Sequence, residues 1–214
     1  MMKLEWRKNE KAIYLPKAKP EIVNVSAYQF ICIQGEGNPN KPFFADYIKA
    51  IYSVAYSIKM NLKKAAVKPQ GYIDWTVYPL EGVWDINDTA KKHYNGEINK
   101  NDFVFKLMIR QPDFVNATYF NEIIALVGKS KPQNLLNKIT FEKIVEGLCV
   151  QMLHVGSFNN EAETFNAMET FANTNGYNRL CKTHREIYIS DFRKVAENKL
   201  KTVLRFKLEP KKSG

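Results

Sequence analysis

Apolar residues recur along this chain in two spacings: alternation, which predicts strands, and a repeat of about 3.6 residues, which predicts helices. The first alternating run is YQFICIQGEGN at residues 28–38, which reaches a glycine at Gly35. A run of the same kind, GLCVQMLHVGSFN at residues 147–159, reaches Gly156. Both runs predict a strand that ends in a polar turn.

A helical pattern follows each of these two strands. After the first strand, apolar side chains recur at helical spacing from Phe44 through Met60. After the second strand, Asn160 is typical of a helix start, and Gly176 predicts the helix end. Each half of the chain therefore begins with a strand and a helix.

Two more strand-like runs complete each half. They are GYIDWTVYPLEGVW (71–84) and DFVFKLMIRQP (102–112) in the first half, and CKTHREIYISD (181–191) and LKTVLRFKLEP (200–210) in the second. The order strand, helix, strand, strand thus occurs twice, which predicts an internal duplication. We expect an α+β fold whose duplicated modules are related by pseudo-twofold symmetry, with a ligand cleft between the halves.

Between the halves lies a segment whose apolar stripe includes Phe120, Ile123 and Val127, so we expect a connecting helix rather than a flexible linker. The predicted organisation is one compact domain with these parts: N-terminal segment 1–21, first module 22–116, connecting helix and loop 117–138, second module 139–210 and tail 211–214.

Composition and charge narrow the class of protein. With 214 residues, 45% of them hydrophobic, the chain is long enough to bury a sizeable core. The net charge of +10 raises the question of nucleic acid, but the lysine pairs are scattered rather than gathered in a stripe, so we expect no specific nucleic-acid partner. The N-terminal run MMKLEWRKNEKAIYLPK is interrupted by charges and resembles neither a signal peptide nor a membrane anchor. We expect a cytoplasmic protein without a membrane partner, and the sequence carries no signal of its oligomeric state.

Cysteine and histidine spacing gives no sign of a bound metal. Cys32, Cys149 and Cys181 are far apart, and we interpret each as a small buried side chain in an apolar strand. The three histidines lack ligand-like spacing with cysteines or acids, and the chain has no glycine-rich phosphate loop. The sequence therefore predicts no metal site and no cofactor.

Glu186 is the leading candidate for a functional residue. In the strand predicted near the C-terminus, His184, Glu186 and Tyr188 project to one face, while Ile187 projects to the other, where a core is expected. A carboxylate buried among aromatic residues requires a partner, a ligand or a raised pKa.

Three other features bear on this candidate. Glu186 has an alternative interpretation, as an exposed carboxylate paired with Arg185 or Arg193. Two further acids, Glu81 and Glu146, each precede a glycine, and we interpret them as turn carboxylates that bind backbone amides rather than as further site acids. The face with Tyr72 and Tyr78 on the strand predicted at 71–84 is expected to meet the Glu186 face across one cavity. The candidate ligand-binding residues are Tyr72, Tyr78, Trp84, His154, His184 and Tyr188.

The motifs of this chain, in their order, resemble those of the GyrI-like small-molecule-binding proteins, in a stand-alone branch without a DNA-binding domain. The motifs are GEGNP, IYSVAYSIK, YPLEGVW, LMIRQPDFV, VEGLCVQMLHVGSFNNEAETF and HREIYISDFRKVAENKLKTVLR, and the resemblance extends over about residues 22–208. The resemblance implies duplicated strand-helix-strand-strand modules that accommodate flat, drug-like aromatic compounds. Some members of this branch resemble hydrolases that open the strained ring of cyclopropanoid genotoxins.

The resemblance also implies roles for individual residues. The family's glutamate within its EIY motif falls on Glu186, and the aromatic residues of its PLEG segment fall on Tyr78 and Trp84. The chain departs from the family pattern at three positions, with Arg185 in place of a histidine, Asp85 in place of an aromatic residue and Phe192 in place of a proline. Arg185 alternates away from Glu186, so we expect it to leave the pocket intact, whereas Asp85 is a change that can alter substrate shape or charge.

Two functions follow, and they share one constellation of residues. In the first, Glu186 is the general base of a hydrolase that opens cyclopropanoids. In the alternative, Glu186 is a counter-ion for hydrophobic or cationic aromatic drugs that are bound without chemistry. A third class, a structural or partner-binding module, would fill the cavity with its own side chains. The sequence does not separate the first two functions, because both need a carboxylate in an aromatic cavity.

Overall fold

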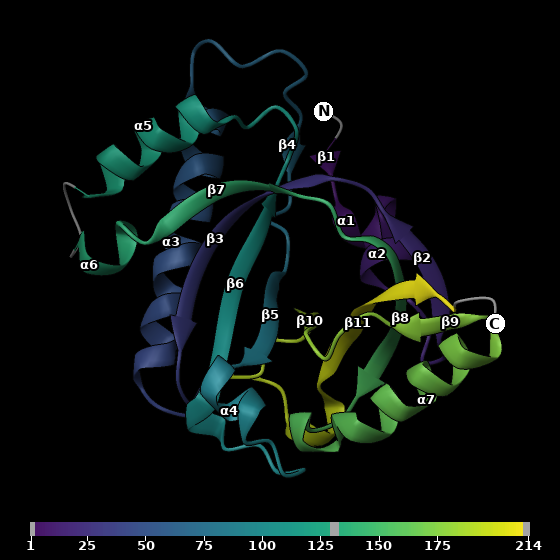
Figure 1. Ribbon diagram of the computed structural model, residues 1–214. Helices are drawn as coiled ribbons and strands as arrows, with labels where there is room; N and C mark the ends of the chain where they lie inside the picture. Colours follow the sequence, from purple (N-terminus) through teal and green to yellow (C-terminus); the bar gives the residue numbers. More distant parts are fainter. Residues whose placement is uncertain (1–2, 129–132, 212–214) are drawn as a thin grey trace. The chain divides into compact units, whose positions relative to one another are not determined.

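The computed structural model describes residues 3–128 and 133–211, which form two compact units. Within the described residues, unit 1 comprises 3–5, 28–78, 84–128 and 133–144, and unit 2 comprises 6–27, 79–83 and 145–211. Each unit contains helices and an antiparallel arrangement of its longer strands, so the predicted α+β class is confirmed (Figure 1). In the described part of the chain, no helix combines the length and the apolar character needed to cross a membrane.

Unit 1 is built on β3 (Tyr28–Glu36), which pairs antiparallel with β6 (Phe103–Gln111) on one side and β7 (Ile139–Ile144) on the other. The helix α3 (Phe43–Lys64) packs on β3 and β6, and its buried stripe runs from Phe44 to Leu62. The predicted helix is therefore confirmed, and it extends four residues beyond Met60, since it ends at Lys64.

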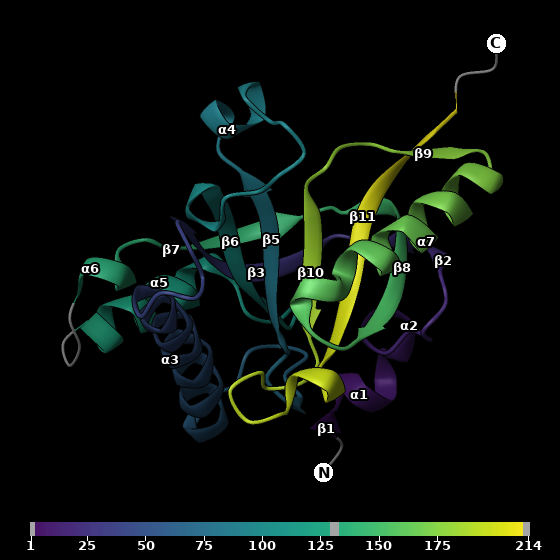
Figure 2. The same ribbon diagram turned by 90° about the horizontal axis from the view of Figure 1, so that it is seen from below.

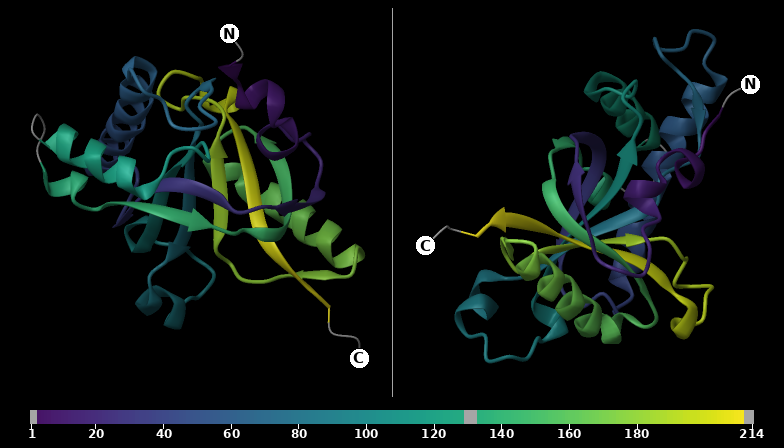
Figure 3. Two further views of the ribbon diagram at one scale, coloured as in Figure 1. Left: turned by 90° about the horizontal axis from the view of Figure 1, so that it is seen from above. Right: turned by 90° about the vertical axis from the view of Figure 1, so that its right-hand side faces the viewer.

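The connecting segment also forms the predicted helix. This is α5 (Ala117–Gly128), which buries Phe120, Ile123 and Val127 and packs beside α3 in unit 1, as the left view of Figure 3 shows. The remaining elements of unit 1 are β1 (Lys3–Leu4), β4 (Asp74–Trp75), the end of β5 (Leu80–Ile86), α4 (Asp88–Lys92), η1 (Lys100–Asp102) and α6 (Gln133–Leu136).

The strand predicted over residues 71–84 is wrong in part, because two short strands replace it. β4 covers only Asp74–Trp75, and β5 begins at Leu80. Between them Tyr78 and Pro79 are outside any strand, and a proline has no N–H to donate to a neighbouring strand. The alternation of faces predicted for Tyr72 and Tyr78 therefore does not hold along one continuous strand.

Unit 2 is built on β8 (Gly147–Val155) and β11 (Lys201–Pro210), which pair antiparallel. β2 (Glu21–Val25) pairs with β8, while β10 (His184–Tyr188) and β9 (Tyr177–Arg179) pair with β11. The other elements of unit 2 are α1 (Trp6–Asn9), α2 (Lys11–Tyr14), η2 (Phe158–Asn160), α7 (Glu161–Thr174), η3 (Glu197–Lys199) and the first part of β5.

The helix α7 lies across one face of β8 and β11 (Figure 2). Its apolar residues Met168 and Ala172 are completely buried against Leu204 and Phe206 of β11. The helix ends before Gly176, whose φ of 83° is a left-handed conformation that favours glycine. The sequence predicted this end of the helix correctly.

The order of elements and one strand pairing recur in the two units. β3, α3, β5 and β6 follow one another along the chain as β8, α7, β10 and β11 do. In each set the first strand pairs antiparallel with the last, and the third neighbours the last. This recurrence is compatible with the predicted duplication. The duplication itself, the module boundaries and the cleft between the halves stay predictions.

Two cysteines behave as predicted and one does not. Cys32 and Cys149 are completely buried in β3 and β8. Cys181 is exposed and lies between β9 and β10, outside any strand. The expectation that it is a buried strand residue is wrong, because the segment before His184 leaves the sheet.

Candidate catalytic site on strand β10

The short strand β10 presents acid–base chemistry on both of its faces. In its pairing with β11, Glu186 lies opposite Leu204, and Arg185 lies opposite Arg205. Since neighbouring strand residues alternate, Glu186 shares the face that α7 covers, and Arg185 lies on the opposite face. The prediction that Arg185 alternates away from Glu186 is confirmed.

Glu186 is buried, with 8% of its surface exposed, and its partner is a histidine rather than an arginine. The Nε2 atom of His184 lies 3.2 Å from Glu186 Oε1, and Phe165 of α7 packs edge-on against the His184 ring at 4.8 Å. Arg193 instead pairs with Asp191. The alternative of an exposed carboxylate paired with arginine is therefore wrong.

A second carboxylate, Glu161, joins this site from the first turn of α7. One carboxylate oxygen from each glutamate and one ring nitrogen of His184 lie within 4.8 Å of one another. Glu161 is 8% exposed, and its Oε1 atom is buried without a hydrogen-bond partner. Burial, and then the negative charge of Glu186, raise the pKa of the Glu161 carboxyl to about 10.

The sequence interpretation missed Glu161, although the helical repeat contained a signal. Glu161, Thr164, Met168 and Ala172 are the buried residues of α7, and they recur at the spacing of one helix face. A glutamate on the buried stripe of a helix is unusual, because an ionised carboxylate there requires compensation. Histidine spacing along the chain could not reveal this group, because one member of it comes from a different element. The expectation that the protein has no metal site stays a prediction.

His154, a predicted ligand-binding residue, has both ring nitrogens engaged within unit 2. Its Nε2 lies 3.0 Å from the Ser157 carbonyl oxygen, and its Nδ1 lies 2.9 Å from Thr164 Oγ1. Because a carbonyl only accepts, Nε2 carries the proton in the neutral ring and Nδ1 accepts from the threonine hydroxyl. His154 thus ties β8 to the start of α7, which holds Glu161 in place.

Replacing Thr164 by Val should destabilise the protein by about 1–3 kcal/mol, because the buried His154 Nδ1 atom loses its donor. Chemical denaturation of both proteins measures this difference. Thr170→Val on the exposed side of the same helix is the matched control, and equal losses in the two variants would show that the hydrogen bond contributes nothing.

Beside the carboxylates, three aromatic side chains form a cluster that we call the aromatic trio: Phe158, Tyr188 and Phe192. Their ring centroids are 6.0–6.3 Å apart, with edge-on geometry. Phe158 retains 37% of its surface exposed. Phe192 stands where the resemblance predicts a proline, so this departure from the family pattern adds a ring to the trio.

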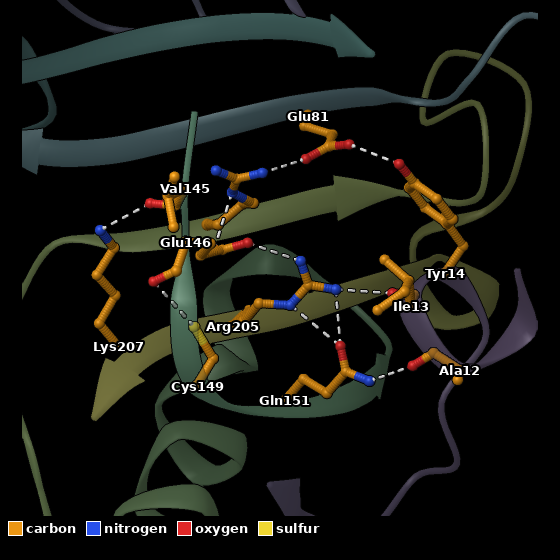
Figure 4. A network of polar contacts seen from close by, with 11 residues as sticks. Ala12, Ile13, Tyr14, Glu81, Val145, Glu146, Cys149, Gln151, Arg205 and Lys207 are labelled. Atoms are coloured by element: carbon orange, nitrogen blue, oxygen red, sulfur yellow. Dashed lines mark hydrogen bonds and ion pairs between the residues drawn. The ribbon is translucent and has the colours of Figure 1, made fainter. Parts of the chain in front are cut away.

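The opposite face of β10 holds a buried ionic network (Figure 4). Arg185 lies 2.8 Å from Glu81 and 3.0 Å from Glu146, and Arg205 lies 2.8 Å from Glu146. All four side chains are at least 93% buried, since none exposes more than 7%. The interpretation of Glu81 and Glu146 as turn carboxylates is therefore wrong, because both are paired with buried arginines from distant strands.

The charges in this network shift the pKa values of its members. Burial alone would raise the pKa of Glu146, but the charges of Arg185 and Arg205 outweigh burial and lower it. At Glu81 burial outweighs the same two arginines and raises the pKa. The Arg185 guanidinium stays charged, because the two glutamates raise its pKa against the effect of burial.

The network also holds the N-terminal helical turns against the sheet of unit 2. Arg205 Nη2 donates to the Ile13 carbonyl at 2.7 Å, and Gln151 Nε2 donates to the Ala12 carbonyl at 2.6 Å (Figure 4). Tyr14 donates its hydroxyl to Glu81 at 3.4 Å. The segment from Trp6 to Tyr14 is thus part of the structure that supports β10 from behind.

The three remaining predicted ligand-binding residues lie in unit 1. Trp84 is 6% exposed and packs against Phe44, Phe103 and Phe105, so it belongs to the aromatic core of that unit. Tyr78 is 2% exposed and lies under the Arg110 guanidinium, which also covers Tyr28. The third residue, Tyr72, packs against Trp75 and Phe114. Their meeting with Glu186 across one cavity stays a prediction.

Comparison with known families identifies the chain. The GyrI-like small molecule binding domain matches residues 18–209. The chain belongs to the GyrI-like family. This confirms the resemblance that the motif order indicates, and small-molecule binding is the property of the matched domain.

Solved structures agree with this family assignment. A hydrolase from Listeria innocua is 32% identical, with a TM-score of 0.84 over 96% of this chain and 100% of that chain. A structure of a hydrolase encoded by lin2189 from the same organism is also 32% identical, with a TM-score of 0.86 over 97% and 100%. The EcmrR C-terminal domain, at 14% identity and a TM-score of 0.52 over 90% and 98%, shares the fold. No curated protein matches the chain.

Proposed function

We propose that this GyrI-like protein binds a planar aromatic small molecule beside β10 and hydrolyses it, with Glu186 as the general base. The observation that supports this most is a buried carboxylate, hydrogen-bonded by His184, next to the aromatic trio. The similarity to proteins named hydrolases from Listeria innocua supports the reaction class. The substrate class we propose is the cyclopropanoid type, which makes the reaction a detoxification.

The chemistry requires little from the protein. A cyclopropane conjugated to a carbonyl is electrophilic through ring strain, so its hydrolysis needs a positioned water and a base. His184 Nε2 donates to Glu186 Oε1, which leaves Oε2 to accept a proton from water, because this oxygen has no hydrogen-bond partner among the described residues. The water oxygen bonds to the ring carbon and the strained carbon–carbon bond breaks. The electron pair of that bond forms a carbon–carbon double bond, and the carbonyl π pair moves onto the carbonyl oxygen. The proton that Glu186 took from water then passes to this oxygen through solvent, which regenerates the base.

Each side chain at the site has a separate part in this proposal. The aromatic trio offers faces and edges on which a flat ring system stacks. His184 orients the base through its hydrogen bond, and Phe165 holds the histidine ring. The network behind β10 fixes the strand, because Arg185 is anchored by two glutamates.

A second candidate function is sequestration of cationic drugs without chemistry. The Glu186 carboxylate and the three aromatic rings together favour a planar cation, since each cation–π contact contributes roughly 0.5–2 kcal/mol. The two functions separate in one assay. Incubation of the protein with an uncharged cyclopropanoid, followed by chromatography, should yield the water adduct if the protein is a hydrolase. Saturable binding of cations with no product from any cyclopropanoid would leave sequestration alone.

Replacing Phe158 by Ala should weaken the binding of an uncharged, fluorescent anthracene derivative by about 2- to 10-fold. This is the loss of affinity expected when one aromatic–aromatic contact with the ligand is removed. Fluorescence titration measures the affinity. Tyr56→Ala, at a 52% exposed aromatic residue of α3, is the matched control and should bind like the native protein. Equal affinity of the native protein and the Phe158 variant would place the ligand away from the trio.

A further inference from the structure

The cluster of Glu161, His184 and Glu186 has the composition of a metal site. Two carboxylates and one imidazole converge from two elements, with Glu161 at the start of α7 and the other two on β10. On a strand, residues two apart project to the same side, so His184 and Glu186 present their ligand atoms together. This pairing is rigid, because both side chains are largely buried.

The distances suit a small divalent cation. The atoms His184 Nε2 and Glu186 Oε1 are 3.2 Å apart, and all three ligand atoms lie within 4.8 Å of one another. Bonds of about 2.0–2.2 Å to nitrogen and oxygen in a tetrahedral arrangement place ligand atoms roughly 3.3–3.6 Å apart. The histidine–glutamate pair is within about 0.1 Å of this spacing, and the Glu161 oxygen lies within 4.8 Å of both atoms.

One buried carboxylate oxygen of this cluster lacks a hydrogen-bond partner. Glu161 is more than nine-tenths buried, and its Oε1 atom has no hydrogen-bond partner. A buried carboxylate oxygen without a partner is costly, and a second carboxylate beside it adds repulsion. A cation held by all three ligands would remove both costs at once.

We propose that Glu161, His184 and Glu186 form a binding site for one divalent cation of the zinc or manganese type. The inference goes beyond the proposed hydrolase, since cation binding is measured without any substrate. Mixed imidazole and carboxylate ligands favour these cations over calcium, which takes six to eight oxygens. Three protein ligands leave at least one position for water, as in catalytic rather than structural sites.

Isothermal titration calorimetry, in which Mn²⁺ or Zn²⁺ is added to chelator-treated protein, tests the proposal by measuring the cation affinity. We expect one saturable site per chain for each cation. Glu161→Gln should weaken both affinities by at least 10- to 100-fold. Losses of this size are typical even when the mutated residue only hydrogen-bonds to a metal ligand. Glu163→Gln, an exposed glutamate of the same helix, is the matched control and should bind like the native protein.

Further controls separate this site from others. The exposed Cys181 is a possible zinc ligand, so the Cys181→Ser variant should bind both cations as the native protein does. Glu161→Gln keeps the shape of the side chain and removes a buried acid, so circular dichroism should show a native fold. The absence of a saturable site at millimolar cation, or equal affinity in native protein and Glu161→Gln, would overturn the inference. These binding results are independent of catalysis. Turnover is measured in a separate assay, in which chelator-treated protein is incubated with a cyclopropanoid.

Discussion

Replacing Glu186 by Gln should lower the turnover of an uncharged cyclopropanoid by about 10²-fold or more, while the affinity for that compound stays within a few-fold of the native value. Glutamine keeps the shape of the side chain and an oxygen that accepts from His184, but it does not take a proton from water. The expected loss is the contribution of a positioned general base, about 10²- to 10⁴-fold.

The same pair of proteins distinguishes a base from a counter-ion. A planar cationic dye should lose affinity in Glu186→Gln if the carboxylate acts through its charge, whereas an uncharged ligand should not. Product formation is followed by chromatography and ligand binding by fluorescence. Both assays contain a chelator, so that no metal ion contributes to turnover or binding. Glu163→Gln controls for the loss of one negative charge near the site. Full turnover by Glu186→Gln would remove Glu186 from the mechanism.

Replacing Arg205 by Met should lower the free energy of unfolding by about 3–5 kcal/mol, the cost of breaking a buried ion pair by removing one partner. The guanidinium is 1% exposed and contacts Glu146, Gln151 and the Ile13 carbonyl at 3.0 Å or less, and methionine offers none of these donors. Urea denaturation measures the difference. Lys201→Met, at an exposed lysine of the same strand, should change stability by less than about 0.5 kcal/mol.

The Arg205 prediction has a counterpart in the pH dependence of stability. Because the folded pKa of Glu146 lies below its ordinary value of 4.5, this residue stabilises the fold above that pH. The contribution is lost as the pH falls through the lowered folded pKa. Arg205→Met should therefore lose less stability than the native protein between about pH 5 and the lowered pKa. A variant within about 1 kcal/mol of native stability at neutral pH would contradict the role assigned to Arg205.

The spacing of apolar residues along the chain predicted the long strands and helices correctly. The strands that became β3, β6, β8 and β11 have long alternating or apolar runs, and α3 and α7 have continuous apolar stripes. The strand predicted over 71–84 failed at Pro79, where two short strands replace it. The short strand β2 was not predicted, because its five residues alone do not distinguish a strand from a loop.

At the candidate site, features that depend on neighbouring residues were predictable, whereas features that depend on residues far apart in the sequence were not. The face of β10 that holds His184, Glu186 and Tyr188 followed from alternation, so it was predictable. The ionic network was not, because Arg185 lies 104 residues from Glu81, and a glutamate before a glycine has the local pattern of a turn. Glu161 is an intermediate case, since the stripe of α7 marks it as buried but only the fold brings it to Glu186.

The central claim is that the small-molecule site lies beside Glu186, and photoaffinity labelling tests it most directly. An uncharged planar aromatic ligand with a photoreactive diazirine is irradiated with the native protein, with and without excess unlabelled ligand, and the labelled peptides are mapped by mass spectrometry. We expect labelling that competitor suppresses at residues 158–168 and 184–192, which hold the aromatic trio and the two carboxylates. Suppressible labelling confined to other segments, such as the open pocket lined by Ile86, His93 and Asp102, would contradict the claim.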